Sequence, residues 1–180
     1  PGGRSGAEGW AWRAWGVGGG GRGGAGGVGV VGGARRDEDR RVMDTTERAL
    51  AAAVDAAVVG NRIGDISASV GGVAHGEGYS INTDFGGHGV GRTMHGDPHV
   101  ANDGPAGRGF PPRDGPVLPL EPSLLATTAE PVTDPARWTL PRADRARAAH
   151  PAPTITINPD RPLVLTHPLF LPVASSPPLP

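Results

Sequence analysis

The sequence predicts an α+β fold, in which two helices come first and short strands follow. Residues 37–58 repeat apolar side chains with the period of an amphipathic helix, and a shorter helical pattern follows from Asp65. Beyond the helices, short runs rich in β-branched residues are separated by turns. Because the helices and strands come in separate runs without strict alternation, the pattern favours an α+β arrangement.

Composition limits the classes of function that the chain can have. Gly (31) and Pro (20) make up 51 of the 180 residues, and there is no cysteine. Disulfides and thiolate metal sites are therefore excluded, and any metal must use His, Asp or Glu. A formal net charge of −1 offers no general attraction to nucleic acid or to an anionic membrane, so we expect neither partner. With no run of 18 apolar residues, we expect a cytoplasmic protein.

Shifts in composition divide the chain into three segments. Residues 1–34 contain 16 glycines and no periodic pattern, so we predict no stable structure there. They include a G-x-G-x-x-G match at 27–32, but no predicted strand precedes it, and a dinucleotide site is not expected. Residues 35–166 carry the helices and strands of a partial catalytic domain. Residues 167–180 hold five prolines and are predicted to be a disordered tail.

The choice of basic residues suggests an origin for the glycine-rich segment. All 17 basic residues are Arg and none is Lys, which is typical of coding DNA rich in G and C. Translation of such DNA out of frame yields sequence rich in Gly, Arg, Pro and Trp. We therefore expect residues 1–34 to be either a disordered or an out-of-frame segment, and the proline-rich tail is a second candidate.

Capping and periodicity locate both helices. Asp37 is a suitable cap, Gly60 offers a stop, and apolar or small residues form one stripe between them. The stripe consists of Val42, Thr46, Ala49, Leu50, Ala53, Val54, Ala57 and Val58. The second helix is predicted to begin at Asp65 and to end in a turn at residues 76–78.

Short strands are predicted after the helices. Residues 79–85 alternate apolar with small or polar side chains, as in a half-buried strand. Further candidates are residues 117–121, 137–140, 154–158 and 163–166. Pro119 has no N–H to donate, so residues 117–121 are expected to form either an edge strand or a damaged strand.

The chemistry is concentrated in the glycine-rich segment at residues 86–98. Glycines on both sides of His88 remove side-chain bulk, so that a ligand or metal could approach the imidazole. His95 lies seven residues further on, and the glycines between the two histidines argue against a helical zinc motif. A loop site is therefore predicted. The alternative is that both are surface histidines in a glycine-rich turn.

This segment resembles the G-H-G-I-G-R-x-x-H-E-x-P motif of type I methionine aminopeptidases, which are pita-bread metallopeptidases of family M24. Residues 59–66 are similar to the V-G-x-x-x-x-D-I turn of that family, and residues 99–104 to its x-V-P-N-x-G segment. Residues 115–123 are similar to G-M-V-x-x-I-E-P-M. The resemblance runs from about residue 37 to 166 and implies an incomplete pita-bread fold. The implied function is metal-dependent hydrolytic removal of the N-terminal methionine from nascent proteins.

The resemblance also implies roles for individual residues. Members of the family bind two divalent metals through two Asp, one His and two Glu ligands. His88 falls on the His ligand and Glu121 on the first Glu ligand. His95 falls on the catalytic histidine that contacts the substrate peptide, while Met94 and Trp138 fall where the methionine pocket is lined. For Trp138, a plain role in the core is an equal alternative.

The sequence departs from the family at the other three ligands. Ala152 occupies the position of the second Glu ligand. The two Asp ligands belong to strands before the first helix, yet residues 1–36 contain no Asp, and Glu8 is their one acidic residue. We therefore expect at most one weakly held divalent ion, whether Co, Mn, Fe or Zn.

The alternative function is that of a catalytically inactive pita-bread fragment that at most binds peptides. The expected partner in either case is a peptide or the N-terminus of a nascent chain, with the ribosome as a further candidate. A monomer is expected. Without the strands of the first half of the family's sheet, the remaining sheet would present an unpaired apolar edge and be only marginally stable.

Overall fold

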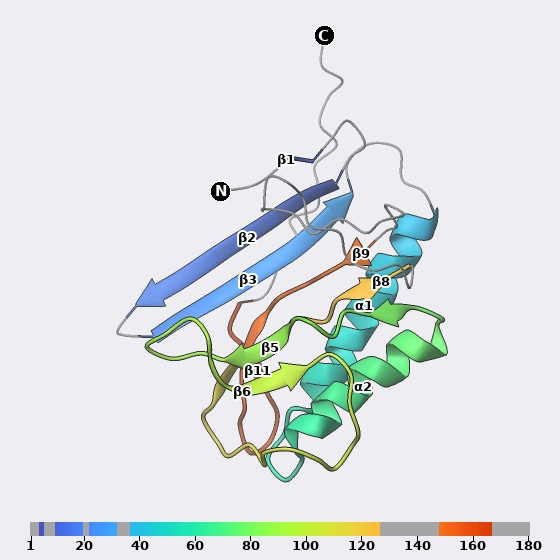
Figure 1. Cartoon of the computed structure of the whole chain (residues 1–180). Helices are drawn as coiled ribbons and strands as arrows, with labels where there is room; N and C mark the ends of the chain where they lie inside the picture. The colour runs from blue at the N-terminus through green and yellow to red at the C-terminus, as the bar shows by residue number, and fades with distance from the viewer. Residues whose placement is uncertain (1–3, 6–9, 20–21, 32–36, 127–147, 167–180) are drawn as a thin grey trace.

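The computed structural model describes residues 4–5, 10–19, 22–31, 37–126 and 148–166. It contains two long helices, α1 (Asp37–Ala56) and α2 (Ile63–Gly76), which pack side by side (Figure 1). Antiparallel strands lie against them, which confirms the predicted α+β class. In the described part of the chain, neither helix has the length and apolar character needed to cross a membrane.

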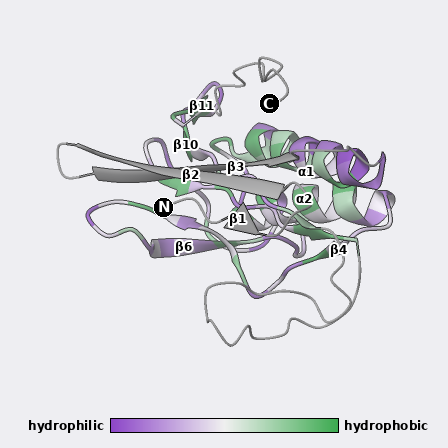
Figure 2. Ribbon diagram, turned by 90° about the horizontal axis from the view of Figure 1, so that it is seen from above, coloured by the Kyte–Doolittle hydropathy of each residue, from purple (hydrophilic) through white to green (hydrophobic). Residues whose placement is uncertain are grey.

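Helix α1 forms as predicted. Three acidic residues, Asp37, Glu38 and Asp39, occupy its first turn, where they interact favourably with the positive end of the helix dipole. Val42, Ala49 and Ala53 of the predicted stripe are buried. Hydrophilic residues predominate in the first half of the helix and apolar residues in its second half, so that both colours alternate along it (Figure 2).

Helix α2 begins at Ile63, two residues before the predicted start. Asp65 lies in the first turn and reaches back, so that its carboxylate accepts a hydrogen bond from the backbone N–H of Arg62 at 2.7 Å. A carboxylate in this position satisfies an N–H that the helix itself cannot pair. Asp65 is therefore a residue that stabilises the start of the helix from within its first turn.

A loop of residues 102–110, the 102–110 loop, covers the start of α2. Its carbonyls at Phe110 and Arg108 accept hydrogen bonds from the N–H groups of Ile63 (3.0 Å) and Gly64 (2.9 Å). The loop also donates its Gly107 N–H to the Asp65 carboxylate at 2.7 Å. The first turn of α2 and the loop thus satisfy one another's polar groups.

The strands form four small sheets with exclusively antiparallel pairing between strands in the described residues. The first sheet has the order β1 (Arg4–Ser5), β2 (Trp10–Gly19), β3 (Arg22–Val31). The second has the order β11 (Leu163–Val164), β10 (Thr154–Thr156), β7 (Val117–Pro119). The third has the order β4 (Ser80–Ile81), β8 (Leu124–Leu125), β9 (Ala148–Ala149), and β5 (Gly86–Gly89) pairs with β6 (Gly96–Ala101).

Part of the segment for which the sequence predicts no stable structure, residues 10–19 and 22–31, is paired in the structure. These form a ladder in register from Trp10 opposite Val31 to Gly19 opposite Arg22 (Figure 1). An antiparallel ladder is made of main-chain hydrogen bonds, which glycine can donate and accept like any other residue. Strand β3 also contacts β7 and β10. These contacts cover part of the remaining sheet, for which the sequence predicts an unpaired apolar edge.

The strand predictions hold in part. Strand β7 lies at the edge of its sheet, as Pro119 indicates, and β10 and β11 fall within the predicted ranges. The candidate at residues 137–140 and the tail at 167–180 lie outside the described residues. Residues 79–85 contain just the two-residue strand β4, because the Asn102 side-chain amide donates to the carbonyls of Asn82 (3.2 Å) and Phe85 (3.1 Å) and bends this segment.

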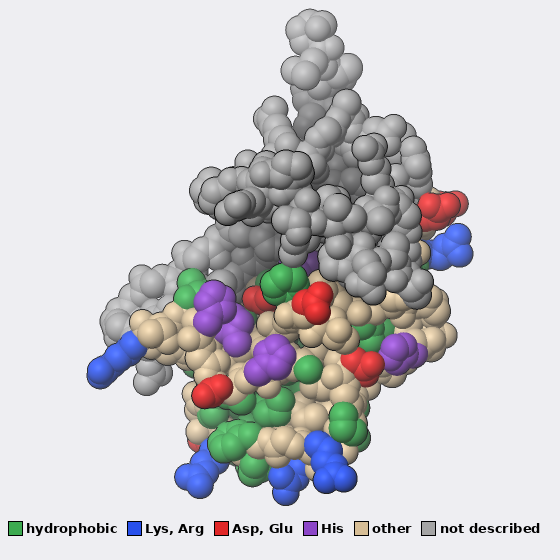
Figure 3. All heavy atoms as spheres, in the orientation of Figure 1, with side chains coloured by type: hydrophobic (Ala, Val, Ile, Leu, Met, Phe, Trp, Pro, Cys, Tyr) green, Lys and Arg blue, Asp and Glu red, His purple; other side chains and the backbone are tan. Residues whose placement is uncertain are grey.

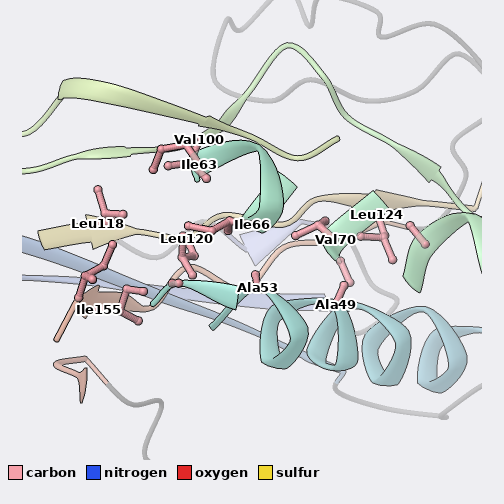
Figure 4. Packing of buried hydrophobic residues seen from close by; sticks show 14 of the residues in the cluster. Ala49, Ala53, Ile63, Ile66, Val70, Val100, Leu118, Leu120, Leu124 and Ile155 are labelled. Carbon is pink, nitrogen blue, oxygen red and sulfur yellow. The ribbon is translucent and has the colours of Figure 1, made fainter. Parts of the chain in front are cut away.

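The core lies between the helices and the strands. Leu118, Leu124 and Ile155 of the strands are fully buried, together with Ala49 of α1 and Ala74 of α2. Figure 4 shows residues of both helices and of β7, β8 and β10 meeting in one cluster. The position of β7 in this core fixes where its carboxyl end lies, and that end leads into the candidate site.

Candidate metal and peptide site

The β5–β6 hairpin positions the two histidines of the glycine-rich motif. The prediction of a loop site is wrong for His88, which lies in β5 opposite His99 of β6. The ladder shifts register directly after His88, and His95 lies in the connection between the two strands. His88 is buried, whereas His95 is exposed. A strand fixes the direction of a side chain more firmly than a loop does, so His88 is the more rigid of the pair.

The glycines that flank His88 have a different use from the one predicted. A Cβ on Gly87 would collide with the Pro119 carbonyl, and a Cβ on Gly89 with the Asp97 carbonyl. The space that these glycines leave is therefore filled by neighbouring backbone and not kept open for a ligand. Because both glycines lack a side chain, β5 fits tightly between β6 and β7, which carries His88 to the end of β7.

Glu121 follows two residues after the end of β7. The Leu120 N–H donates to the Pro153 carbonyl at 2.9 Å, which ties this segment to the chain before β10. Glu121 lies with Oε1 3.8 Å from Nε2 of His88, and its side chain is 22% exposed. The structure therefore brings together the two residues that the resemblance implies as metal ligands.

His95 lies next to this pair. Its ring centroid is 4.5 Å from that of His88, with the ring planes tilted by 49°. Met94 is 45% exposed, so its side chain is accessible from solvent. Trp138 lies outside the described residues. Histidine side chains gather with acidic ones on the face of the molecule shown in Figure 3.

His150 is a site residue that the sequence reasoning missed. Its Nε2 lies 3.9 Å from Oε2 of Glu121, and its Nδ1 donates to the Pro122 carbonyl at 3.3 Å. The pairing of Leu124 with Ala149 in β8 and β9 places it beside Glu121. One signal was present in the sequence, because His150 lies two residues before the ligand position occupied by Ala152.

His88 and Glu121 fit as ligands of one divalent ion. Their 3.8 Å separation is too long for a hydrogen bond but lies within the ~4.2 Å that two ligands, each ~2.1 Å from one ion, can span. A cluster of three or more metal-ligating side chains around one point is not found in the described residues. Ala152 is 5% exposed and provides no carboxylate. The described residues thus bring together two of the ligands that the resemblance implies and do not form the family's five-ligand, two-metal centre.

A cavity of about 280 Å³ lies next to the site, between the β5–β6 hairpin and β7. Its lining includes Gly89, Asp97 and Leu118, and none of the predicted site residues. The cavity is thus separate from the cluster around Glu121.

Comparison with known proteins places these features in a family. The family model described as metallopeptidase family M24 matches residues 20–145. Methionine aminopeptidase 1 of Mycobacterium tuberculosis is 37% identical over 140 residues, which are 74% of this chain and 53% of that protein. Methionine aminopeptidase of Clostridium acetobutylicum is 36% identical over 134 residues, covering 74% of this chain and 54% of that protein. The chain therefore spans about half the length of the curated relatives it matches.

Solved structures agree with the sequence matches. The crystal structure of a methionine aminopeptidase from Thermotoga maritima has a TM-score of 0.83 and 29% identity, and covers 87% of this chain and 63% of that chain. A prolidase from Pyrococcus furiosus, at 18% identity and a TM-score of 0.66, shares the fold over 88% of this chain and 41% of its own. The chain thus belongs to metallopeptidase family M24, with a partial pita-bread fold similar to that of the methionine aminopeptidases.

Proposed function

We propose that the chain takes part in metal-dependent hydrolytic removal of the N-terminal methionine from peptides and nascent proteins. The observation that carries this proposal is the position of buried His88 between Glu121, at 3.8 Å, and His95, whose ring lies 4.5 Å away. This places two candidate metal ligands beside a candidate substrate-binding histidine. The similarity to methionine aminopeptidases of 36–37% identity supports the same function.

Each of these residues has a distinct task in the proposed site. The Nδ1 of His88 donates to the Gly89 carbonyl at 2.9 Å, which leaves Nε2 as the metal-binding nitrogen. A divalent metal held by His88 and Glu121 would supply a nucleophilic water and polarise the scissile carbonyl. The exposed His95 is free to hydrogen-bond the substrate peptide, and Met94 beside it would line the methionine pocket with Trp138.

The metal and the partners follow from the same proposal. One imidazole and one carboxylate can bind Co, Mn, Fe or Zn. The ion that occupies the site would therefore depend on which of these metals is available. We propose that the chain acts as a cytoplasmic monomer and meets its substrates as nascent chains at the ribosome. Neither a membrane nor a nucleic acid is a proposed partner.

The test is release of free methionine from the peptide Met-Ala-Ser by the full chain, with Co, Mn, Fe or Zn supplied in turn. We expect turnover that needs metal, that is lost in His88→Gln and Glu121→Gln, and that falls about 100-fold or more in His95→Gln. His99→Gln is the matched control, because this exposed histidine lies on the paired strand. Absence of turnover with all four metals would refute hydrolysis by this chain.

A second candidate function is peptide binding without hydrolysis. The observation that favours it is the buried Ala152 at the position of the second Glu ligand, which leaves the two-metal centre incomplete. Calorimetric titration with a non-hydrolysable Met-Ala-Ser analogue distinguishes the two functions. Binding without any release of methionine from the natural peptide would support this second function and exclude the first.

A further inference from the structure

We propose that Asp103 is a modification site, at which the chain rearranges through a succinimide to isoaspartate. The tripeptide Asp-Gly-Pro occurs twice in the sequence, at residues 103–105 and 114–116. Aspartate followed by glycine is open to this reaction, because glycine has no side chain to shield its amide nitrogen. Since the two copies have the same local sequence, a difference between them must come from the structure. This inference does not depend on the proposed function.

The reaction joins two groups that are neighbours in the chain. The Gly104 nitrogen bonds to Cγ of Asp103, whose carboxyl reacts in its protonated form, and the hydroxyl of that carboxyl leaves with the amide proton as water. A second water then adds to the main-chain carbonyl of Asp103 and breaks its bond to the Gly104 nitrogen. The main chain afterwards runs through Cγ, and a carboxylate remains on Cα.

The structure holds the Asp103 carboxyl group against the nitrogen with which it would react. The Gly104 N–H donates to Oδ1 of Asp103 at 2.9 Å. Oδ2 lies 3.0 Å from Nε2 of His75, which fixes the other oxygen of the carboxyl group. Gly71 leaves room for this arrangement, because a Cβ there would collide with Oδ1. Groups that are already held in contact lose little further freedom when they react.

The second copy is held differently by the fold. The Gly115 N–H donates to the Ile157 carbonyl at 2.9 Å, and the Gly115 carbonyl accepts from Oγ1 of Thr156 at 3.4 Å. Attack of the Gly115 nitrogen on Asp114 would therefore break the hydrogen bond to Ile157. Asp114 is exposed, whereas the Asp103 side chain is 38% exposed. Exposure thus favours reaction at Asp114, and the hydrogen-bond geometry favours Asp103.

The rearrangement would change how the 102–110 loop is attached to α2. An added methylene group lengthens the main chain between Asp103 and Gly104, and the carboxylate on Cα no longer takes the place of Oδ2 beside His75. The pair that joins α2 to the loop would then be lost. The NMR resonances of the His75 imidazole should therefore change as the modified form accumulates.

The test is incubation of the full folded chain at neutral pH in water labelled with ¹⁸O, followed by digestion with trypsin and mass spectrometry. Hydrolysis of each succinimide takes up ¹⁸O, and the two copies fall in separate tryptic peptides, 93–108 and 114–137. Fragmentation of the peptides locates the label. We expect labelling at Asp103 to be at least about 5-fold faster than at Asp114, where a backbone hydrogen bond must first break. Equal rates, or faster labelling at Asp114, would overturn the inference.

The unfolded chain is the first control. In concentrated urea both copies should be labelled at similar rates, because they share the same tripeptide and the fold is lost. A preference for Asp103 that is as large in urea as in the folded chain would assign the difference to sequence and overturn the structural argument.

Gly104→Ala is the matched variant. A Cβ on Gly104 lies 3.5 Å from Cβ of Ser67, which is an ordinary contact, so we expect this variant to fold, and circular dichroism checks it. Labelling at Asp103 should slow at least about 5-fold because the methyl group shields the amide nitrogen, while Asp114 should react as before. Unchanged labelling at Asp103 in the folded variant would overturn the proposed attack by the Gly104 nitrogen.

Discussion

Ala152 is the residue at which the candidate site differs most from the resemblance. It is 5% exposed, so a larger side chain at this position would enter a packed region near Glu121. A carboxylate there has two opposed effects. It would supply a metal ligand, but without a metal it would be a buried and unpaired charge.

Replacement of Ala152 by Glu should therefore make stability depend on metal. We expect Ala152→Glu to lower the thermal unfolding temperature of the metal-free chain and to raise Co²⁺ affinity at least about 10-fold. Thermal unfolding and Co²⁺ titration check this. Ala152→Gln, of similar size but uncharged, is the control and should lower stability without a gain in affinity. Equal affinity of the Glu and Gln variants would contradict the prediction.

At the residue scale, the sequence identified those site residues that belong to a recognisable motif. His88, His95 and Glu121 lie within continuous stretches of matching residues, and the structure brings them together. His150 could not be identified in this way, because it lies beside Glu121 through the pairing of β8 with β9, and the Pro122 carbonyl that it contacts is 28 residues away in the chain. Contacts made by strand pairing depend on register, which local sequence does not determine.

Gly64 and Gly72 of helix α2 provide a matched test at the element scale. A Cβ on Gly64 would lie 2.5 Å from the Pro105 carbonyl and 2.7 Å from the Arg108 carbonyl, whereas a Cβ on exposed Gly72 meets nothing within 4 Å. Gly64→Ala should therefore destabilise the chain by about 1–3 kcal/mol. Gly72→Ala should stabilise it by roughly 0.5–1 kcal/mol, because alanine has the higher helix propensity. Urea unfolding measures both, and equal effects would refute the docking of the 102–110 loop.

Asp65 gives the start of α2 a dependence on pH. Hydrogen bonds from the backbone N–H groups of Arg62 and Gly107 lower the pKa of Asp65 from its ordinary value of 3.8. A lowered pKa in the folded state means that the ionised carboxylate contributes stability above pH 3.8, and that this stability is lost as pH falls through the lowered pKa.

Asp65→Asn should therefore unfold at a lower temperature than the unaltered chain at pH 7. The difference should shrink as the pH falls below 3.8, because the protonated carboxyl of the unaltered chain no longer accepts both bonds as an anion. Thermal unfolding at several pH values measures it. Asp114→Asn, which changes an exposed carboxylate outside α2 and the 102–110 loop, serves as the control. A difference that stays constant between pH 7 and pH 3 would contradict the assignment.

Elements differed in how well the sequence predicted them. Helix α1 was predicted because its buried stripe repeats with helical period, and α2 because apolar residues follow a suitable acidic residue. The β2–β3 hairpin was missed, since its pairing rests on the main chain and glycine carries no pattern of alternation. The strand expected at residues 79–85 is shortened by Asn102, which is far away in sequence.

The whole molecule is held together by one core, which a pair of leucines in the same sheet can test. Leu118 of β7 is fully buried, whereas Leu163 of β11 is 54% exposed. Leu118→Ala should cost about 2–5 kcal/mol of unfolding free energy, because it removes buried surface and leaves a cavity. Leu163→Ala should change it by no more than about 0.5 kcal/mol. Urea unfolding of both variants checks this, and a similar cost for each would show that the sheet is not packed as described.

At this scale, the resemblance predicted the family and the fold, and the structure brings residues of separate sheets together at the candidate site. His88 comes from β5, Glu121 follows β7, and His150 follows β9, so that three separate sheets meet at one carboxylate. The α+β class followed from the order of elements. How the sheets meet could not be predicted, because that depends on long-range packing in the core.

The amide of Asn102 has a chemical consequence for the long-term integrity of the site. Its nitrogen donates to two carbonyls, at Asn82 and Phe85, in the segment that leads into β5 and His88. Spontaneous deamidation would exchange that nitrogen for an oxygen and turn a double donor into an anion that faces two acceptors. A single slow hydrolysis event, without any change in the gene, would thus replace two hydrogen bonds to the Asn82 and Phe85 carbonyls by electrostatic repulsion. As the protein ages, this would displace the segment that leads to His88.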